Sequence, residues 1–304
     1  MTTEHWQNRP ERGSLLTLRI MVKLSLSFGR RGTRWLLYGI VAYFLFFSPA
    51  SVRASRDYLQ RVLPRRPDWH DLFQHFLTFA TTLHDRIFLL NEKTEQFHIT
   101  LHGKPLLDEL AQSASGVILM GAHLGSFEIL HAIARSHPEI RISILMYPDN
   151  AQKIQSVLHA INPANIPDII PLGTAGAMLD VQQRLAAGHW IGILADRGLH
   201  HTATASFDFL GKPASFPLGP FRLATALKQR VIFMTGLYSK HHYDLYFEPL
   251  ADFTHTERQQ RAAAIAHAQA DYVNKLAYYC RQAPYNWFNF FDFWSAPDEK
   301  RPDT

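Results

Sequence analysis

The amino-acid sequence predicts an α/β fold in which a mostly parallel central sheet is flanked by helices and follows an N-terminal helical segment. From residue 67 onward, apolar runs of strand length alternate with longer stretches of helical spacing, the order that builds parallel sheets. The chain has 304 residues, of which 47% are hydrophobic, enough to bury a large core. The first 66 residues differ from the rest in charge and apolarity, which marks them as a separate segment.

The alternation assigns an element to most of the region after residue 67. Strands are expected at residues 97–101, 116–121, 142–146, 168–172, 190–195, 231–237 and 243–248. Helices are expected at residues 70–90, 104–110, 125–135, 150–161, 175–187, 220–228 and 257–282. About twenty residues after Ala195 are predicted to form a loop, which is long enough to suggest a function. We therefore expect one α/β domain over residues 67–304.

Residues 1–66 account for the whole net positive charge of the chain. They contain twelve Lys and Arg residues against three acidic ones, whereas the remainder contains 19 against 23. Their most apolar stretch, residues 35–47, would form a helix of about 20 Å, shorter than the roughly 30 Å hydrocarbon core of a bilayer. Arginines on both sides favour a membrane-associating segment that lies in or dips into an anionic leaflet. A single membrane span and a buried core helix remain alternatives.

Several other classes of protein are disfavoured. Nucleic-acid binding is another use of a basic arm, but the aromatic and apolar residues beside these arginines favour a membrane surface. The lone Cys280 excludes an internal disulfide and a multi-cysteine metal cluster. No metal site is predicted, because the pairs at 200–201 and 241–242 are interpreted as loop and surface histidines. There is no phosphate-cradling glycine motif and no Gly-x-Ser-x-Gly elbow.

The most informative motif places a histidine directly after a buried strand. Residues 119–128 read Leu-Met-Gly-Ala-His-Leu-Gly-Ser-Phe-Glu, with His123 and Glu128 five positions apart. The two side chains can meet only if His123 precedes the helix and folds back over its first turn. Glu128 would then fix the imidazole tautomer and leave the other nitrogen as a general base. No Ser or Cys nucleophile accompanies the pair, so the substrate would supply the attacking group. The alternative is a loop histidine beside a capping glutamate.

Four motifs in order carry a resemblance to a known family. They are Gly121-Ala-His-Leu-Gly-Ser-Phe-Glu128, Asp196-Arg197, Phe209-Leu-Gly-Lys-Pro-Ala-Ser-Phe-Pro-Leu-Gly-Pro220, and Pro284-Tyr-Asn-Trp287 with the aromatic run to Trp294. Over roughly residues 20–295 the chain resembles the lysophospholipid acyltransferase superfamily, specifically the bacterial branch that acylates lipid A and ends in a Pro-x-x-Trp signature. Within that branch it looks closest to predicted acyltransferases encoded beside aryl-polyene and related lipid pathways.

The resemblance implies a membrane-associated acyltransferase. By match, His123 is the general base that removes the acceptor proton, and Glu128 orients it. The donor would be a phosphopantetheine thioester, on acyl carrier protein or on CoA, and the acceptor a lipid or glycolipid. Thioesters transfer readily, so base catalysis and positioning suffice, and no metal or other cofactor is expected. Basic flanks and the carrier protein imply the cytoplasmic face of a bacterial inner membrane.

The same match supplies substrate-binding residues. They are Gly125, Asp196, Arg197, Phe216, Pro217 and Gly219. The planar guanidinium of Arg197 suits a phosphate, with a salt bridge to Asp208 or another acid as the alternative. Gly125, Pro217 and Gly219 are equally compatible with purely geometric roles in turns.

Two departures from the family pattern bear on the acceptor. Residues 146–150 lack the Arg that usually follows the corresponding strand, and Asp196-Arg197-Gly198 stands where Asp-Gln-Asp is common. An acceptor other than lipid A is therefore expected. A thioester hydrolase that uses the same base on water, and a non-catalytic lipid-binding protein, remain the alternative functions.

Overall fold

The structure is a computed structural model that describes residues 15–113, 115–130, 137, 139–174, 176–198 and 202–294. Its centre is a seven-stranded sheet in the order β1-β9-β8-β2-β5-β3-β4, parallel at every neighbouring pair except β8–β9. The strands are β1 (His98–His102), β2 (Ile118–Gly121), β3 (Ile142–Met146), β4 (Asp168–Pro171), β5 (Trp190–Leu194), β8 (Arg230–Ser239) and β9 (His242–Asp252). The predicted α/β fold with a mostly parallel sheet is confirmed.

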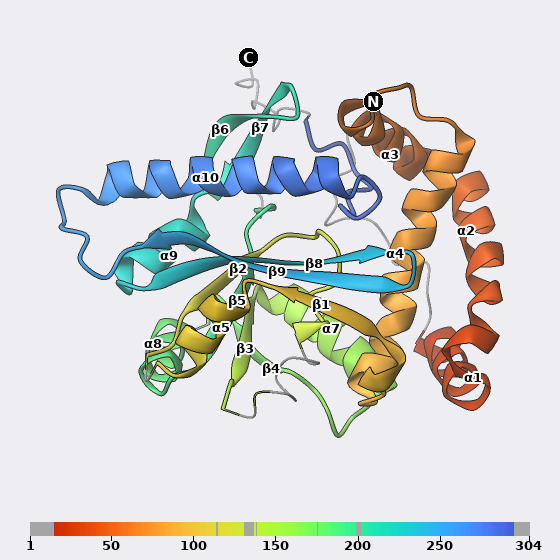
Figure 1. Cartoon of the computed structure of the whole chain (residues 1–304), viewed down its shortest axis with the longest axis horizontal. Helices are drawn as coiled ribbons and strands as arrows, with labels where there is room; N and C mark the ends of the chain where they lie inside the picture. The colour runs from red at the N-terminus through yellow and green to blue at the C-terminus, as the bar shows by residue number, and fades with distance from the viewer. Residues whose placement is uncertain are drawn as a thin grey trace, which may run out of the picture.

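Helices cover both faces of this sheet, and α10 runs across one of them (Figure 1). The helices after the N-terminal region are α4 (Trp69–Leu90), α5 (Lys104–Ala111), α7 (Pro148–Ile161), α8 (Ala177–Ala186), α9 (Gly219–Ala226) and α10 (Arg261–Gln282), with a 3-10 turn at Thr94–Gln96. The side chains of β2 alternate between the two layers. Ile118 and Met120 join the apolar cluster that includes α8, α9 and α10, whereas Leu119 joins the cluster that includes α5 and α7.

The segment after β5 differs from the predicted loop. It contains an antiparallel hairpin of β6 (Thr204–Phe209) and β7 (Lys212–Pro217), separate from the main sheet. Of the helix predicted at 125–135, residue 125 forms an isolated bridge with Gly236, residue 130 is helical, and residues 131–136 lie outside the described residues. The histidine pair at 200–201 lies outside them as well.

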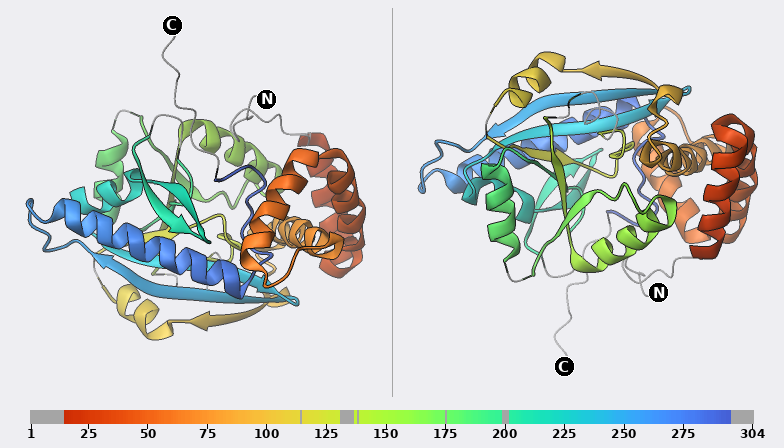
Figure 2. Two further views of the ribbon diagram at one scale, coloured as in Figure 1. Left: turned by 90° about the horizontal axis from the view of Figure 1, so that it is seen from above. Right: turned by 90° about the horizontal axis from the view of Figure 1, so that it is seen from below.

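Three N-terminal helices pack beside α4 at one end of the sheet (Figures 1 and 2). They are α1 (Leu15–Thr33), α2 (Trp35–Phe47) and α3 (Pro49–Val62). Among the described helices, none alone has the length and apolarity to cross a bilayer, although α2 and α3 together, bent by 97°, meet both criteria. The membrane association of this segment stays a prediction.

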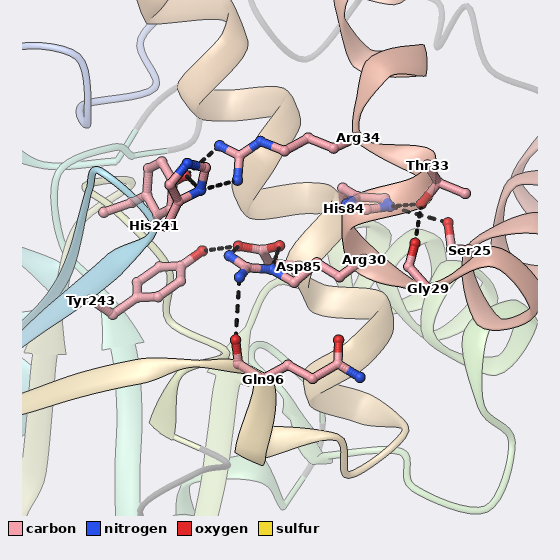
Figure 3. Close-up of polar contacts among 11 residues, drawn as sticks. Ser25, Gly29, Arg30, Thr33, Arg34, His84, Asp85, Gln96, His241 and Tyr243 are labelled. Carbon is pink, nitrogen blue, oxygen red and sulfur yellow. Dashed lines mark hydrogen bonds and ion pairs between the residues drawn. The ribbon is translucent and has the colours of Figure 1, made fainter.

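Buried polar contacts attach α1 to the body of the protein (Figure 3). The Arg30 guanidinium pairs in bidentate fashion with the buried Asp85 carboxylate at 2.7 and 2.8 Å, and the Tyr243 hydroxyl donates to the same carboxylate at 2.9 Å. Nε2 of the buried His84 lies 3.1 Å from Ser25 Oγ and 2.9 Å from Thr33 Oγ1. Because a buried carboxylate is costly without partners, this network fixes α1 against α4 and β9.

Candidate active site

A histidine and an aspartate meet at the carboxyl ends of two neighbouring parallel strands. β2 and β5 pair in register up to Gly121 and Leu194, so the residues that follow each strand emerge side by side. His123 Nδ1 lies 2.9 Å from Asp196 Oδ1. An ionised carboxylate can only accept, so Nδ1 carries the proton and Nε2 holds the free lone pair. The carboxyl ends of parallel strands are where α/β proteins place their sites.

The surroundings keep the imidazole neutral and the carboxylate charged. Burial, followed by the positive charge of Arg197, lowers the pKa of His123 below its ordinary value, against the opposing effect of Asp196. Burial alone would raise the pKa of Asp196, but the contacts with His123, Arg197 and Trp287 hold that pKa well below its usual range. The Asp196 side chain is fully buried, whereas 38% of the His123 side chain is exposed. The pair therefore presents an unprotonated base at neutral pH.

The C-terminal segment completes the surroundings of Asp196. Trp287 Nε1 donates to Asp196 Oδ2 at 3.2 Å, and Arg197 Nε lies 3.6 Å from the same oxygen. Arg197 also donates to the Phe288 carbonyl at 2.6 Å and lies 5.0 Å from the centre of the Phe291 ring. The sequence suggests Asp208 as a salt-bridge partner for Arg197, and the structure gives it Asp196 instead. Arg197 also lines the cavity described below.

The structure differs from the prediction that Glu128 orients His123. The Glu128 carboxylate forms an ion pair with Arg86 at 2.5 Å and accepts from Ser126 Oγ at 3.2 Å. The physical reason is local: the residues after His123 bridge to other segments rather than starting a helix, and Arg86 on α4 attracts the glutamate. Asp196 therefore makes the hydrogen bond that the sequence assigned to Glu128.

A large apolar cavity of about 1000 Å³ opens beside His123. Its apolar walls come from α4, β3, α7, β5, α9 and the C-terminal segment, through side chains such as Phe79, Ile144, Leu158, Ile193, Leu223 and Phe290. Its polar and charged lining includes His123, Glu128, Arg86, Arg197 and Arg222. Such a cavity suits a long apolar group with a polar end near the imidazole.

The predicted substrate-binding residues divide into two groups. Gly125, Arg197, Pro217 and Gly219 line the cavity. Asp196 lies behind His123, and Phe216 is fully buried against Phe209, with 5.3 Å between ring centres. The structure thus corrects the placement of Phe216, because the alternation of the β7 hairpin strand turns its ring into the core. Within the described part of the chain, no three His, Cys, Asp or Glu side chains are grouped as metal ligands.

Gly125 is required by a close backbone approach. Its φ is +71°, and a Cβ built there would stand 2.0 Å from the Gly236 carbonyl oxygen. Its N–H donates to the Asn286 carbonyl at 2.8 Å, so the loop carrying His123 is held between β8 and the C-terminal segment. Gly125 is therefore needed for the path of the backbone, and it also lines the cavity.

We expect Gly125→Ala to destabilise the protein by about 3 kcal/mol or more, because the left-handed backbone strain adds to a clash with main chain. Gly211→Ala is the matched control, since its φ is +82° but no atom of the described residues lies within 4 Å of the position that the added methyl group would take. That control should cost only about 1 kcal/mol. Urea unfolding of both variants measures the difference, and equal losses would contradict the close approach.

Sequence reasoning missed two contributors to this site. Arg86 gives no sequence signal, since it is one of several charges on a long helix. Trp287 stands in the Pro-x-x-Trp signature, to which the sequence gives no role, and the motif match assigns Asp196 to substrate rather than to His123. Arg86 and Trp287 both lie far from His123 along the chain. Asp196 is also distant, at 73 positions from His123.

The molecule is an α/β protein in which a His–Asp pair follows two parallel strands and faces an apolar cavity. The sequence model of the bacterial lipid A biosynthesis acyltransferases matches residues 19–295, and the chain belongs to this family. The protein is accordingly an acyltransferase, and the family indicates a lipid acceptor. No curated protein matches the sequence. The closer likeness to aryl-polyene acyltransferases stays a prediction.

Proposed function

We propose that the protein moves a fatty acyl group from an acyl-carrier-protein thioester, or from CoA, to a hydroxyl or amine of a lipid or glycolipid, with His123 as general base. One observation carries this proposal: His123 Nδ1 is held at 2.9 Å by a buried carboxylate while the imidazole faces a large apolar cavity. A tautomer fixed in this way keeps Nε2 unprotonated and aimed at substrate.

The transfer balances without a covalent enzyme intermediate. Nε2 of His123 takes the proton of the acceptor as its oxygen or nitrogen forms a bond to the thioester carbonyl carbon. The tetrahedral intermediate collapses, the carbon–sulfur bond breaks, and the departing thiolate takes the proton back from the imidazolium. Asp196 stabilises the imidazolium between these two steps, as a buried carboxylate does in hydrolytic triads. The step requires no further cofactor.

Two arginines suit the anionic parts of the substrates. Arg86 and Arg197 line the same cavity as His123, and their Nε atoms are buried with no hydrogen-bond partner among the described residues. Phosphopantetheine and most bacterial membrane lipids carry phosphate, which a guanidinium binds through its planar fork. Glu128 would hold Arg86 in place until substrate enters. Because the motif differences argue against lipid A, the acceptor proposed is another lipid or glycolipid, with aryl-polyene lipids as the specific candidate.

The deciding experiment supplies the detergent-extracted protein with labelled acyl-carrier thioesters of several chain lengths and a total lipid extract from the native cell. Mass spectrometry then identifies the products, with His123→Ala as the blank. An acylated lipid made only by the wild-type protein supports the proposal and identifies the acceptor. Release of free fatty acid without an acylated product would replace it with the hydrolase. Lipid binding without any turnover would replace it with the non-catalytic function.

We further propose that the protein acts at the cytoplasmic face of a bacterial inner membrane, attached through α2. Leu37 and Val41 of α2 are buried on the side of α4. The exposed side chains of α2 are Trp35, Tyr38, Ile40, Tyr43, Phe46 and Phe47. So large an apolar aromatic face suits an interface with lipid, and the exposed Arg53 and Arg56 on α3 suit anionic head groups.

We expect Phe46→Ser/Phe47→Ser to weaken flotation with anionic liposomes by roughly ten-fold or more, since each buried phenyl ring contributes about 1.5–3 kcal/mol. Leu179→Ser/Tyr278→Ser is the matched control, because both side chains are more than half exposed on other helices. Acyl transfer in detergent should be unchanged in both double variants. Equal flotation of the two variants would contradict attachment through α2.

A further inference from the structure

The Pro-x-x-Trp signature near the C-terminus has no assigned task in the acyl transfer proposed above. In the structure its tryptophan, Trp287, is fully buried and contacts two separate parts of the site. Its indole N–H donates to Asp196, and its backbone forms an antiparallel bridge with Leu124, the neighbour of His123. The chain that carries it returns from α10 alongside α4 (Figures 1 and 2).

The same segment holds the main chain on both sides of Leu124. The Phe288 N–H donates to the His123 carbonyl at 2.8 Å, and the Gly125 N–H donates to the Asn286 carbonyl at 2.8 Å. Residues 286–288 therefore form hydrogen bonds both to the backbone around His123 and to the Asp196 carboxylate that orients its side chain. A shift of Trp287 would move both.

Trp287 is in turn fixed from α4. Nε2 of the buried His75 lies 2.8 Å from the Trp287 carbonyl oxygen, and Nδ1 lies 2.7 Å from Ser55 Oγ on α3. A carbonyl oxygen can only accept, so Nε2 carries the proton and Nδ1 accepts from the serine hydroxyl. Hydrogen bonds thus link Ser55, His75 and the main-chain carbonyl of Trp287, and the indole of the same residue continues the connection to Asp196 and His123. Every one of these side chains except that of His123 is buried.

We propose that Trp287 is a positioning residue of the acyl transfer, which sets Asp196 and through it the tautomer and direction of His123, and which takes its own place from His75 on α4. The inference rests on the proposed role of His123 as base. It assigns the Pro-x-x-Trp signature a task in catalysis rather than in packing alone. It also links the N-terminal helices to the reacting imidazole through α3 and α4.

Trp287→Phe tests this inference, because it keeps an aromatic ring among Tyr58, Phe209 and Phe293 and removes only the N–H donor and part of the ring. Trp294→Phe is the matched control. It removes an indole N–H from the same aromatic cluster, but that N–H donates to the Phe209 carbonyl at 3.1 Å and not to Asp196. We expect Trp287→Phe to lower kcat about 10- to 100-fold with KM nearly unchanged, and Trp294→Phe to leave kcat within about two-fold.

A double-mutant cycle separates positioning from packing. If Trp287 acts through Asp196, the Trp287→Phe change should cost almost nothing further in an Asp196→Asn background. A merely structural role would lower kcat by the same factor in both backgrounds, and that result would overturn the inference. So would equal kcat values for Trp287→Phe and Trp294→Phe. Thermal melting of all four variants checks that each is folded.

His75→Phe tests the link to α4 separately. It keeps a ring against Phe290, which stacks on His75 with 4.7 Å between ring centres, and removes the hydrogen bond to the Trp287 carbonyl. We expect a smaller fall in kcat than in Trp287→Phe, again with KM nearly unchanged. An unchanged kcat would remove His75 from the inference. Absence of acyl transfer by the wild-type protein would instead refute the proposed function, so the two failures are distinguishable.

Discussion

His123→Ala should lower kcat for acyl transfer by about 10²- to 10⁴-fold, the range that a positioned general base supplies. KM for the thioester should change little, because the apolar walls of the cavity that would bind the acyl chain remain. The measurement is the rate of acylated lipid formation at saturating donor, with thermal melting as the check on folding. Equal rates for variant and wild type would remove His123 from the chemistry.

The pH dependence of the wild-type enzyme follows from the same site. Burial and the charge of Arg197 lower the pKa of His123 below its ordinary value near 6.5. A base works only when unprotonated, so the midpoint of the acid limb of kcat/KM should lie below pH 6.5. An acid limb centred above pH 7 would contradict the placement of His123 in this cavity.

The central strands β2 and β5 were predictable because they are short and apolar, and because each is bounded by turn residues. Ile118–Gly121 and Trp190–Leu194 are buried on both faces, and such strands read as continuous apolar runs. The β6–β7 hairpin was not predicted, although Leu210 and Gly211 between its strands both have positive φ, as a type I′ hairpin turn requires. A leucine at such a position is uncommon, so the turn gave no recognisable signal.

The His–Asp pair was harder to predict than the fold. Finding it requires knowing that β2 and β5 are neighbours, and sequence alone does not give the order of strands in a sheet. The spacing of His123 and Glu128 is local, so it drew attention to a nearby carboxylate. The partner in the structure is a carboxylate that follows the adjacent strand. Sequence therefore singled out His123 and part of the cavity lining, whereas the hydrogen-bond partner of His123 depends on which strands are neighbours in the sheet.

Substitutions of Asp196 and Glu128 should show which of these two carboxylates orients His123. Asp196→Asn should lower kcat by about 10³-fold or more, because an amide can donate to Nδ1 and stabilise the wrong tautomer, and the same change in a serine protease triad costs about 10⁴-fold. Glu128→Gln is the matched control from the same site. It should leave kcat within about ten-fold and act mainly on KM, because its carboxylate pairs with Arg86 rather than with His123.

The pH profiles of these two variants provide an independent check on the assignment. Asp196 raises the pKa of His123 through its charge and its hydrogen bond. The charge of Glu128 also raises this pKa, but by less than Asp196 does. Loss of the Asp196 charge should therefore move the acid limb of the residual activity to lower pH, whereas Glu128→Gln should move it less. If Glu128→Gln instead caused the larger loss of kcat and the larger shift, substrate binding would have to bring Glu128 onto Nδ1 in place of Asp196. The hydrogen bond from His123 to Asp196 would then belong to the enzyme before substrate binds and not to the arrangement that reacts.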